Sequence, residues 1–311
     1  MEKIVTLTLS PAIDKSTTVD TVVPDKKLRC SVPKFEPGGG GVNVSRAIKK
    51  LGGNSTAVYL AGGHSGKHFQ DLLKKEEIES CVVEIEDRTR ENLIVVDTST
   101  NLQYRFTMPG PVIHEHEWQQ CIKILEKASG IEYIVASGSL PKGVPEDFFS
   151  RLAVTAKKIN ARLIADTSGV HLQYAVNEGL FMIKPNLGEL SNLHGVEDLQ
   201  AEDVVKAAKD IIRKGGCEVM VISMGALGAM MVTKDVVLKS PSPVVKKRST
   251  VGAGDSMVAA MVLAFLRKYT LTEVLHYGIA AGTAATMNPG TALCIKEDVE
   301  KLYNCLKAGN W

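Results

Sequence analysis

The sequence predicts an α/β protein, with a mainly parallel β-sheet covered by helices on both faces and a small antiparallel β lid over one edge. Apolar runs of strand length recur between amphipathic stretches of helix length, which is the alternation typical of parallel sheets. Two segments, about 15–35 and 90–107, break this rhythm because they are polar, alternating and rich in Val and Thr. Since open α/β sheets bind ligands at the carboxyl ends of their strands, a lid inserted after the first strand would cover the binding crevice.

The elements of the main sheet are expected along the whole chain. Apolar runs that predict buried strands cover residues 4–9, 133–136, 163–165, 181–183 and 219–222. Helical periodicity covers residues 145–159, 201–214, 255–267, 271–287 and 297–306. No internal repeat, low-complexity tract or long linker interrupts them, so we expect residues 1–311 to form one domain.

Composition narrows the class of protein. The 311 residues are 44% hydrophobic and 23% charged, as in globular proteins, and a formal net charge of +2 gives no general field that would attract nucleic acid or an anionic membrane. Six scattered cysteines without a C-x-x-C pair indicate neither a zinc site nor a redox motif, and predict reduced thiols in a cytoplasmic protein. Neither a secretory signal nor an apolar stretch long enough to span a bilayer is visible, so we expect a soluble protein.

The first glycine-rich segment lies where a helix should begin. The run Gly38, Gly39, Gly40 and Gly41 is followed closely by Asn43. Backbone without side chains can approach a ligand, and the unpaired N–H groups of a helix amino terminus bind anions and hydroxyls. The Asn43 side chain adds a donor and an acceptor that suit sugar hydroxyls. A flexible loop before a helix would carry the same glycines and is the alternative.

The second glycine-rich segment opens a strongly apolar helix. It places Gly252, Ala253 and Gly254 directly before Asp255. Backbone donors at this helix start can face the charge on a transferring phosphoryl group, and Asp255 at the mouth of such an anion hole would be the base that activates an acceptor hydroxyl. A carboxylate at a helix start is also an ordinary cap. The two glycines favour the catalytic interpretation, because a simple cap does not need them.

Two later segments follow predicted strands and suit a nucleotide. Asn186 and Glu189 stand one turn apart at a helix start, where they either hold a hydrated magnesium ion with phosphate oxygens or form a capping box. The run from Ser223 through Gly225 to Gly228 offers flat backbone on which a nucleotide can lie.

The commoner nucleotide-binding patterns fail. Lys67 is followed by His68, and Ala61 stands where a P-loop requires its first glycine. Asn43 stands where the dinucleotide fingerprint requires its third glycine. The first failure argues against a P-loop fold, and the second argues against a nucleotide-binding oxidoreductase. For the oxidoreductase alternative the test is a thermal-shift assay, in which a nicotinamide cofactor should not change the melting temperature.

Taken in order, these segments make the sequence similar to the ribokinase-like sugar kinases, and within them to the phosphofructokinase B branch. The motifs that carry the resemblance cover nearly the whole chain, at residues 7–14, 38–47, 137–141, 184–189 and 251–256. The resemblance implies a ribokinase-like three-layer sandwich and an ATP-dependent kinase. Relatives that act on fructose 1-phosphate or tagatose 6-phosphate usually carry a lysine where this chain has Gly40, so the sequence looks more like the minor, type B 6-phosphofructokinases.

The resemblance also implies a sugar-phosphate site. Asp14, glycines 38–41, Asn43 and Ser139 would hold the sugar. Arg90 and Arg105 on the lid would bind its phosphate, since the fork of donors on a guanidinium meets phosphate oxygens in pairs.

For the nucleotide and the ions, the resemblance implies the following positions. ATP would contact Lys27, Lys184, Asn186, Glu189, Ser223, Gly225, Gly228, Lys247, Ile279 and Thr283. A monovalent cation, expected to be potassium, would lie beside the anion hole on largely backbone oxygens of Ser249, Val251, Ala285, Asn288, Gly290 and Ala292. Magnesium would accompany ATP and contact Glu189 through water. Gly188 stands where a close relative would carry a lysine, and Lys247 where a serine is common, which leaves nucleotide affinity and inhibition by ATP open.

The expected reaction is the phosphorylation of fructose 6-phosphate at its 1-hydroxyl, with Asp255 taking the proton. Kinases for tagatose 6-phosphate or fructose 1-phosphate are the alternatives, and a non-catalytic sugar-phosphate sensor is the alternative from another class. The resemblance implies a homodimer formed through the lid, and the Val and Thr alternation at residues 16–23 is compatible with a strand pair that takes a partner. Neither nucleic acid nor membrane is expected as a partner.

Overall fold

A computed structural model describes residues 1–309 of the chain. The strands are Ile4–Thr8 (β1), Ala12–Val19 (β2), Lys34–Gly38 (β3), Thr56–Ala61 (β4), Glu79–Glu84 (β5), Arg90–Asp97 (β6), Leu102–Phe106 (β7), Tyr133–Ser137 (β8), Arg162–Asp166 (β9), Leu180–Ile183 (β10), Cys217–Ser223 (β11), Ala229–Thr233 (β12) and Val237–Ser240 (β13). The helices are Gly40–Lys50 (α1), Gly63–Lys75 (α2), Glu115–Lys127 (α3), Phe148–Lys158 (α4), Gly169–Glu178 (α5), Leu187–His194 (α6), Val204–Arg213 (α7), Ala253–Leu266 (α8), Leu271–Thr286 (α9) and Lys296–Lys307 (α10), with a short 3₁₀ helix at Gly225–Leu227 (η1). The strands and helices predicted for the main sheet are all present, with ends that differ by a few residues.

The main sheet has nine strands in the order β13-β12-β11-β10-β9-β8-β1-β4-β5. Every pairing from β5 to β11 is parallel, and only the pairings of β11 with β12 and of β12 with β13, at one edge, are antiparallel. This confirms the prediction of a mainly parallel sheet. The parallel strands are buried on both faces, which is why they appear in the sequence as continuous apolar runs rather than as alternating ones.

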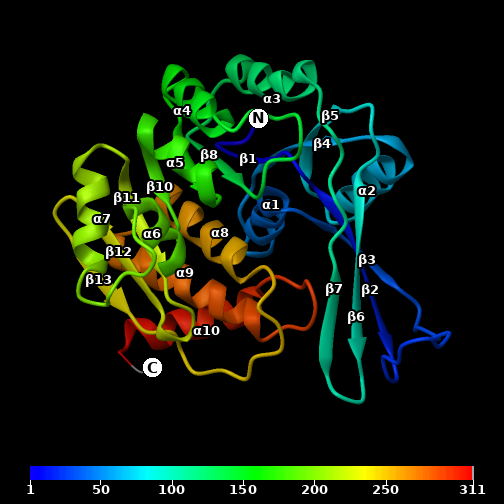
Figure 1. Ribbon diagram of the computed structural model, residues 1–311. Helices are drawn as coiled ribbons and strands as arrows, with labels where there is room; N and C mark the ends of the chain where they lie inside the picture. The colour runs from blue at the N-terminus through cyan, green and yellow to red at the C-terminus, as the bar shows by residue number, and fades with distance from the viewer. Residues whose placement is uncertain (310–311) are drawn as a thin grey trace.

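Helices cover both faces of this sheet and form a three-layer molecule (Figure 1). One core joins the sheet to α3, α4, α5, α6 and α7. The core on the opposite face joins it to α1, α8, α9 and α10, and α2 packs beside α1 on the same face. Among residues 1–309, no helix combines the length and the apolar character that crossing a bilayer requires.

Helix α8, which carries the glycine-rich turn, is buried along most of its length. Residues 256–264 are all buried, and the helix is apolar on every side, as expected for a segment enclosed by other helices. A Cβ at Gly278 of α9 would lie 2.6 Å from Cγ of Met261, so the two helices approach closely there. The first turn of α8 is therefore held in place by a helix that is tightly packed against its neighbours.

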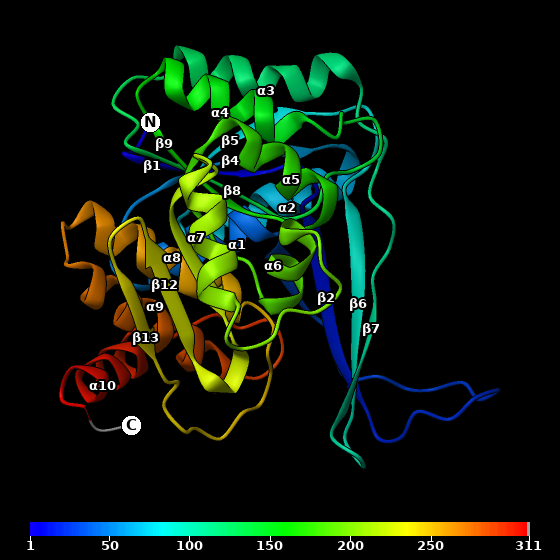
Figure 2. The ribbon, with the colours of Figure 1, turned by 60° about the vertical axis from the view of Figure 1, so that its left-hand side comes forward.

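The lid is a separate four-stranded sheet, in the order β3-β2-β6-β7, that projects from the body as an arm (Figure 2). Its outer pairings, β2–β3 and β6–β7, are antiparallel as predicted, but the central pairing of β2 with β6 is parallel. The predicted antiparallel lid is therefore present, with one parallel pairing at its centre. The reason is that β2 and β6 both leave the same edge of the main sheet and extend in the same direction.

Candidate active site

The candidate site lies at the carboxyl edge of the main sheet, where the lid begins. The strands β1, β8, β9 and β10 end there, and the first turns of α1 and α8 meet above them. Parallel strands end together at one edge, so residues that are far apart in the sequence are brought together. The site therefore has three parts: a carboxylate on α8, a glycine turn at the base of the lid, and a cavity beside β11.

Asp255 lies in the first turn of α8, and Gly252 is the N-cap of that helix. Gly252 adopts a left-handed conformation, with φ of 71°, which explains the need for glycine at this turn. No side-chain hydrogen bond caps the helix, so the interpretation of Asp255 as an ordinary cap is wrong. Its Oδ2 instead accepts a hydrogen bond of 3.0 Å from Nδ2 of Asn43 on α1.

The surroundings of Asp255 raise its pKa to about 6. Burial has the largest effect, because it disfavours the charged carboxylate, and the negative charge of Asp166 acts in the same direction. Asn43, Lys184 and Ser137 oppose the shift by stabilising the ionised form. A carboxylate with a pKa just below neutrality is ionised at pH 7 and basic enough to accept a proton from a hydroxyl.

Lys184 and Asp166 form an ion pair beside this carboxylate. Lys184 follows β10, Asp166 ends β9, and Nζ lies 3.2 Å from Oδ1. Burial is the largest single effect and would lower the pKa of Lys184, but attraction and hydrogen bonding to Asp166, together with the charges of Glu189 and Asp255, raise this pKa overall, so the ammonium stays charged. Asp166 was not predicted as a site residue, although its position directly after an apolar strand run is the same signal that marked Lys184.

A gap lies between this ion pair and α8. A Cβ at Gly254 would lie 3.5 Å from Nζ of Lys184 and 4.0 Å from Oδ2 of Asp166. The first-turn N–H groups of a helix have no intrahelical acceptor, and they favour negative charge. Because Gly254 has no side chain, the first-turn N–H groups of α8 and the ammonium of Lys184 can both face the same space.

The glycine run ends β3 and begins α1, with Gly39 as the N-cap at φ 115°. A Cβ at Gly40 would lie 2.7 Å from the carbonyl carbon of Ser137, and one at Gly41 would lie 2.7 Å from Oγ1 of Thr8. A Cβ at Gly38 would meet the carboxylate of Asp14. The flexible-loop alternative is therefore wrong, because the glycines let a helix start pack against the ends of β1 and β8.

Asp14 and Asn92 join the two halves of the lid at its base. Nδ2 of Asn92 donates a 2.8 Å hydrogen bond to Oδ1 of Asp14, and burial raises the pKa of Asp14. Asn92 was not predicted as a site residue.

The two lid arginines differ in their surroundings. Arg90 is half-buried, and its guanidinium donates to the carbonyl oxygens of Ser10 at 3.0 Å and Met108 at 3.2 Å. Its Nε is buried and has no hydrogen-bond partner among the described residues. Arg105 is exposed on β7, where Nε donates to Gln103 at 2.9 Å.

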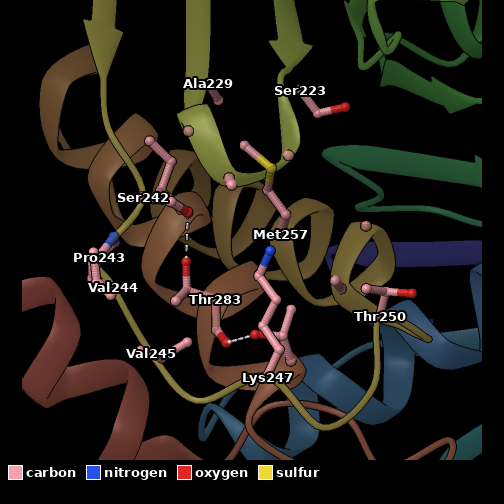
Figure 3. Close-up of a pocket in the computed structure, with 18 of the residues that line it drawn as sticks. Ser223, Ala229, Ser242, Pro243, Val244, Val245, Lys247, Thr250, Met257 and Thr283 are labelled. Atoms are coloured by element: carbon pink, nitrogen blue, oxygen red, sulfur yellow. Dashed lines mark hydrogen bonds between the residues drawn. The ribbon is translucent and has the colours of Figure 1, made fainter.

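A cavity of about 460 Å³ opens beside the carboxyl end of β11 (Figure 3). Its walls come from Lys184 just after β10, Ser223 at the end of β11, η1, the loop after β13, and helices α8 and α9. The predicted residues that line it are Lys184, Ser223, Gly225, Gly228, Lys247, Ala253, Gly254, Ile279 and Thr283. Residues 242–245 of the loop after β13 and Met257 of α8 also line the cavity and were not predicted.

Three residues predicted for the nucleotide lie outside the cavity wall. Asn186 and Glu189 form a reciprocal capping box at the start of α6: Glu189 N–H donates to Oδ1 of Asn186, and Asn186 N–H donates to Oε2 of Glu189, both at 2.9 Å. The structure thus contains the capping box that was the alternative to a magnesium site. Lys27 is exposed in the loop between β2 and β3 of the lid. Ser139, predicted for the sugar, is exposed just after β8.

The residues predicted for a monovalent cation come from the loop before α8, the last turn of α9 and the loop after α9. Oγ of Ser249 donates to the carbonyl oxygen of Gly290 at 2.7 Å, and the backbone N–H of Ser249 approaches the carbonyl oxygen of Thr286 at 3.3 Å. Nδ2 of Asn288 donates to the carbonyl oxygen of Leu293 at 3.1 Å. The donor set of carbonyl and hydroxyl oxygens suits a hard cation. Within residues 1–309, no cluster of three or more His, Cys, Asp or Glu side chains could hold a metal ion.

Comparison with known proteins agrees with this geometry. The profile of the pfkB family of carbohydrate kinases matches residues 1–298. The chain is 45% identical, over 97% of its length and 98% of the relative's, to ATP-dependent 6-phosphofructokinase isozyme 2 of Escherichia coli (strain K12). It is 30% identical, over 92% of its length and 93% of the relative's, to 1-phosphofructokinase of Bacillus subtilis (strain 168). The crystal structure of Escherichia coli phosphofructokinase-2 in complex with potassium superposes with a TM-score of 0.94, at 44% identity, and covers 99% of this chain and 100% of that chain.

Proposed function

Because this chain belongs to the pfkB family of carbohydrate kinases, we propose that it transfers the γ-phosphoryl group of ATP to the 1-hydroxyl of fructose 6-phosphate. The observation that carries the proposal is the position of Asp255. Its carboxylate bonds to Asn43 at the glycine turn under the lid, and its helix begins in the wall of the 460 Å³ cavity. One carboxylate thus faces both a place for a sugar and a place for a nucleotide.

In the proposed reaction, Asp255 accepts the proton of the 1-hydroxyl as that oxygen attacks the γ-phosphorus in line. The new bond joins O1 to phosphorus, the bond from phosphorus to the bridging oxygen of ADP breaks, and ADP leaves with that electron pair. Charge on the transferring group is met by the backbone N–H groups of residues 252–254 and by the ammonium of Lys184. The pKa of Asp255, at about 6, places its working range at neutral pH.

The lid and the glycine turn supply the sugar site in this proposal. Asp14, half-buried and held by Asn92, and the backbone of residues 38–41 would bind the sugar hydroxyls, with Ser139 at the rim. Arg105 is exposed and free to turn toward a phosphate, whereas Arg90 is already anchored to the lid base through Nη1 and Nη2 and has fewer free N–H groups to offer. The two arginines would therefore contribute unequally.

Kinases of this family use ATP with magnesium, which neutralises phosphate charge when it is bound. In this chain, Lys184, Ser223, Gly225, Gly228, Lys247, Ile279 and Thr283 line the proposed nucleotide cavity. Glu189, one turn beyond Lys184 and half-buried, would contact the hydrated ion, and its capping bond with Asn186 would position it. Residues 249, 251, 285, 288, 290 and 292 would hold potassium, an assignment supported by the potassium complex of the similar Escherichia coli structure.

The proposed sugar substrate, fructose 6-phosphate, has two alternatives, fructose 1-phosphate and tagatose 6-phosphate. The relative at 45% identity is a 6-phosphofructokinase, whereas a 1-phosphofructokinase matches at 30%. Gly40 supports the same choice, because its position against Ser137 leaves no space for the lysine that other branches carry. The decisive experiment compares kcat/KM for fructose 6-phosphate, fructose 1-phosphate and tagatose 6-phosphate, with Mg-ATP, in potassium and in a large organic cation. A preference for either of the latter two sugars would replace the proposed substrate, and absence of turnover with all three would favour the sensor.

We also propose that residues 1–311 act as one cytoplasmic kinase domain that dimerises through its lid. The exposed side chains of Leu102, Tyr104 and Phe106 alternate along the edge strand β7, so they lie on one face of it. An exposed edge strand with apolar side chains is a surface that pairs with another chain. Sedimentation of the protein and of a Tyr104→Glu variant tests this, and a monomer at micromolar concentration for the unsubstituted protein would refute it.

A further inference from the structure

A buried carboxylate in the lid has one polar contact within its own strand and others outside the lid sheet. Glu36 lies on β3, only 7% exposed, immediately before the glycine turn. Its Oε2 accepts a 2.6 Å hydrogen bond from Oγ1 of Thr291, which is 5% exposed. Thr291 stands between Gly290 and Ala292, in the loop after α9 that we assign to the monovalent cation. Figure 1 shows this orange-red loop beside the base of the lid strands.

The same carboxylate faces a buried arginine on the opposite side. Nη2 of Arg46 on α1 lies 3.6 Å from Oε1 of Glu36, and the Arg46 side chain is 3% exposed. Arg46 makes two hydrogen bonds of 2.7 Å to Glu76 at the end of α2, and Nη1 donates to the carbonyl oxygen of Pro37 at 2.8 Å. Arg46 therefore ties the lid strand β3 to both helices behind it.

Arg46 also reaches the residue that touches the proposed base. Its Nη1 lies 3.4 Å from Oδ1 of Asn43, one turn earlier on α1, and Asn43 donates to Asp255 through Nδ2. Polar contacts therefore run without a break from Thr291 through Glu36, Arg46 and Asn43 to Asp255. All of these side chains are buried or half-buried, where charge-assisted bonds are strong and an unpaired charge is costly.

We propose that Glu36 and Thr291 are positioning residues that couple the monovalent-cation loop to the sugar-phosphate site. Ordering of residues 288–292 by a cation would fix the hydroxyl of Thr291 against Glu36, and Glu36 with Arg46 would fix the lid base and the glycine turn. Linkage then requires the reverse effect as well: the sugar phosphate, by fixing the lid base, tightens cation binding by the same factor. The inference rests on the proposed function, because it needs both sites.

The coupling is measured without catalysis. The dissociation constant of fructose 6-phosphate is determined by calorimetry on the full chain without ATP, in potassium chloride and in tetramethylammonium chloride of equal ionic strength. We expect potassium to tighten sugar-phosphate binding at least about fivefold in the unsubstituted protein, which is the lower range of typical coupling. Thr291→Val keeps the shape of the side chain and removes the hydroxyl, and it should bring this ratio below about twofold.

Two variants separate coupling from general damage. Thr291→Ser keeps the hydroxyl and should retain the ratio. Lys34→Met removes a contact of 2.9 Å to the same carboxylate that comes from within β3 and does not lead to the cation loop, so it should also retain the ratio. If Thr291→Val fails to fold, Glu36→Gln is used in its place, and the ratio of the two dissociation constants should fall below about twofold in that variant as well.

The outcomes distinguish the inference from the function. The proposed coupling is wrong if potassium does not affect the binding of fructose 6-phosphate. It is also wrong if Thr291→Val and Glu36→Gln both retain the ratio of the unsubstituted protein. Neither result contradicts the proposed kinase function. Absence of fructose 6-phosphate binding in both salts overturns the proposed substrate, and the inference with it.

Discussion

Nδ2 of Asn43 donates a 3.0 Å hydrogen bond to Oδ2 of Asp255, which joins the first turns of two helices that are 212 residues apart. The bond ties the glycine turn under the lid to the helix that opens the nucleotide cavity. It also holds the carboxylate toward the lid and lowers its pKa against the stronger effect of burial. The position of the proposed base and its acidity thus depend on the same contact.

Replacement of Asp255 by Asn should abolish most of the turnover and leave nucleotide binding intact. A positioned general base contributes about 10² to 10⁴ in rate, so kcat should fall by at least that range. The cavity proposed for ATP keeps its lining in this variant, so the dissociation constant measured by calorimetry should change less than about threefold. Asp235→Asn, in the exposed turn between β12 and β13, is the matched control. Near-normal turnover in the Asp255 variant would remove this residue from the base role.

The same variant should be more stable than the unsubstituted protein at pH 8. The pKa of Asp255 rises on folding from 3.8 to about 6, so its contribution to stability is present below pH 4 and is lost as pH rises through 6. Removal of the charge should then raise the free energy of unfolding at pH 8 by at most about 3 kcal/mol. Thermal melts of both proteins at pH 5 and pH 8 measure this, and the gap should narrow at pH 5. A lower melting temperature for the variant at pH 8 would contradict the assigned cause of the shift.

The pH profile should move when Asn43 is replaced. In the unsubstituted protein, kcat/KM should fall about tenfold per pH unit below pH 6, because protonated Asp255 cannot accept a proton. The hydrogen bond from Asn43 lowers this pKa, so Asn43→Ala should shift the midpoint of the acid limb upward. Loss of a sugar contact alone would lower kcat/KM at every pH and leave the midpoint in place, which makes the midpoint the informative quantity.

Much of this architecture could be predicted from the sequence, because buried parallel strands are continuous apolar runs. The ends of β1, β8, β9, β10 and β11 were found in this way, and with them the edge that carries the site. The strands β4 and β5 were not among the predicted ones. Edge strand β5 has only one fully buried residue, Val83, and gives a weaker signal.

The site was predicted less completely, for two physical reasons. Asn92 acts through a contact with Asp14, 78 residues earlier, so no local pattern marks it, and Asp166 follows an apolar strand run but gains its role only from the ion pair with Lys184. The parallel pairing of β2 with β6 depends on where both strands leave the body, which alternation in the sequence does not encode. The Asn186–Glu189 capping box, by contrast, is local and was visible as an alternative.

A methyl group in the glycine turn should be far more damaging than one at α6. In Gly41→Ala the new Cβ would meet the carbonyl oxygen of Leu7 and lie 2.7 Å from Oγ1 of Thr8. Such overpacking costs about 1 to 3 kcal/mol and would displace the start of α1. Gly188→Ala is the matched control, since its Cβ would meet only Oδ1 of Asn186 at 3.5 Å. We expect a lower melting temperature and at least tenfold lower kcat/KM for Gly41→Ala alone, and equal behaviour of the two variants would refute the packing account.

Substitution of the two lid arginines should have different effects on sugar-phosphate binding and on stability. Arg105 is exposed, and its hydrogen bond to Gln103 is local, so Arg105→Ala should leave the melting temperature within about 1 °C. It should still raise KM for the sugar phosphate about 10- to 100-fold, because a hydrogen bond to a charged group contributes about 1.5 to 3 kcal/mol. Arg90→Ala should both raise KM and lower the melting temperature, because it leaves the carbonyl oxygens of Ser10 and Met108 without their donor. Gln103→Ala is the control, because it removes the hydrogen-bond partner of Arg105 and leaves the charge of Arg105 in place. If Arg105→Ala binds sugar phosphate normally while Arg90→Ala does not, the phosphate is recognised at the base of the lid alone, and the proposed role of β7 in binding is wrong.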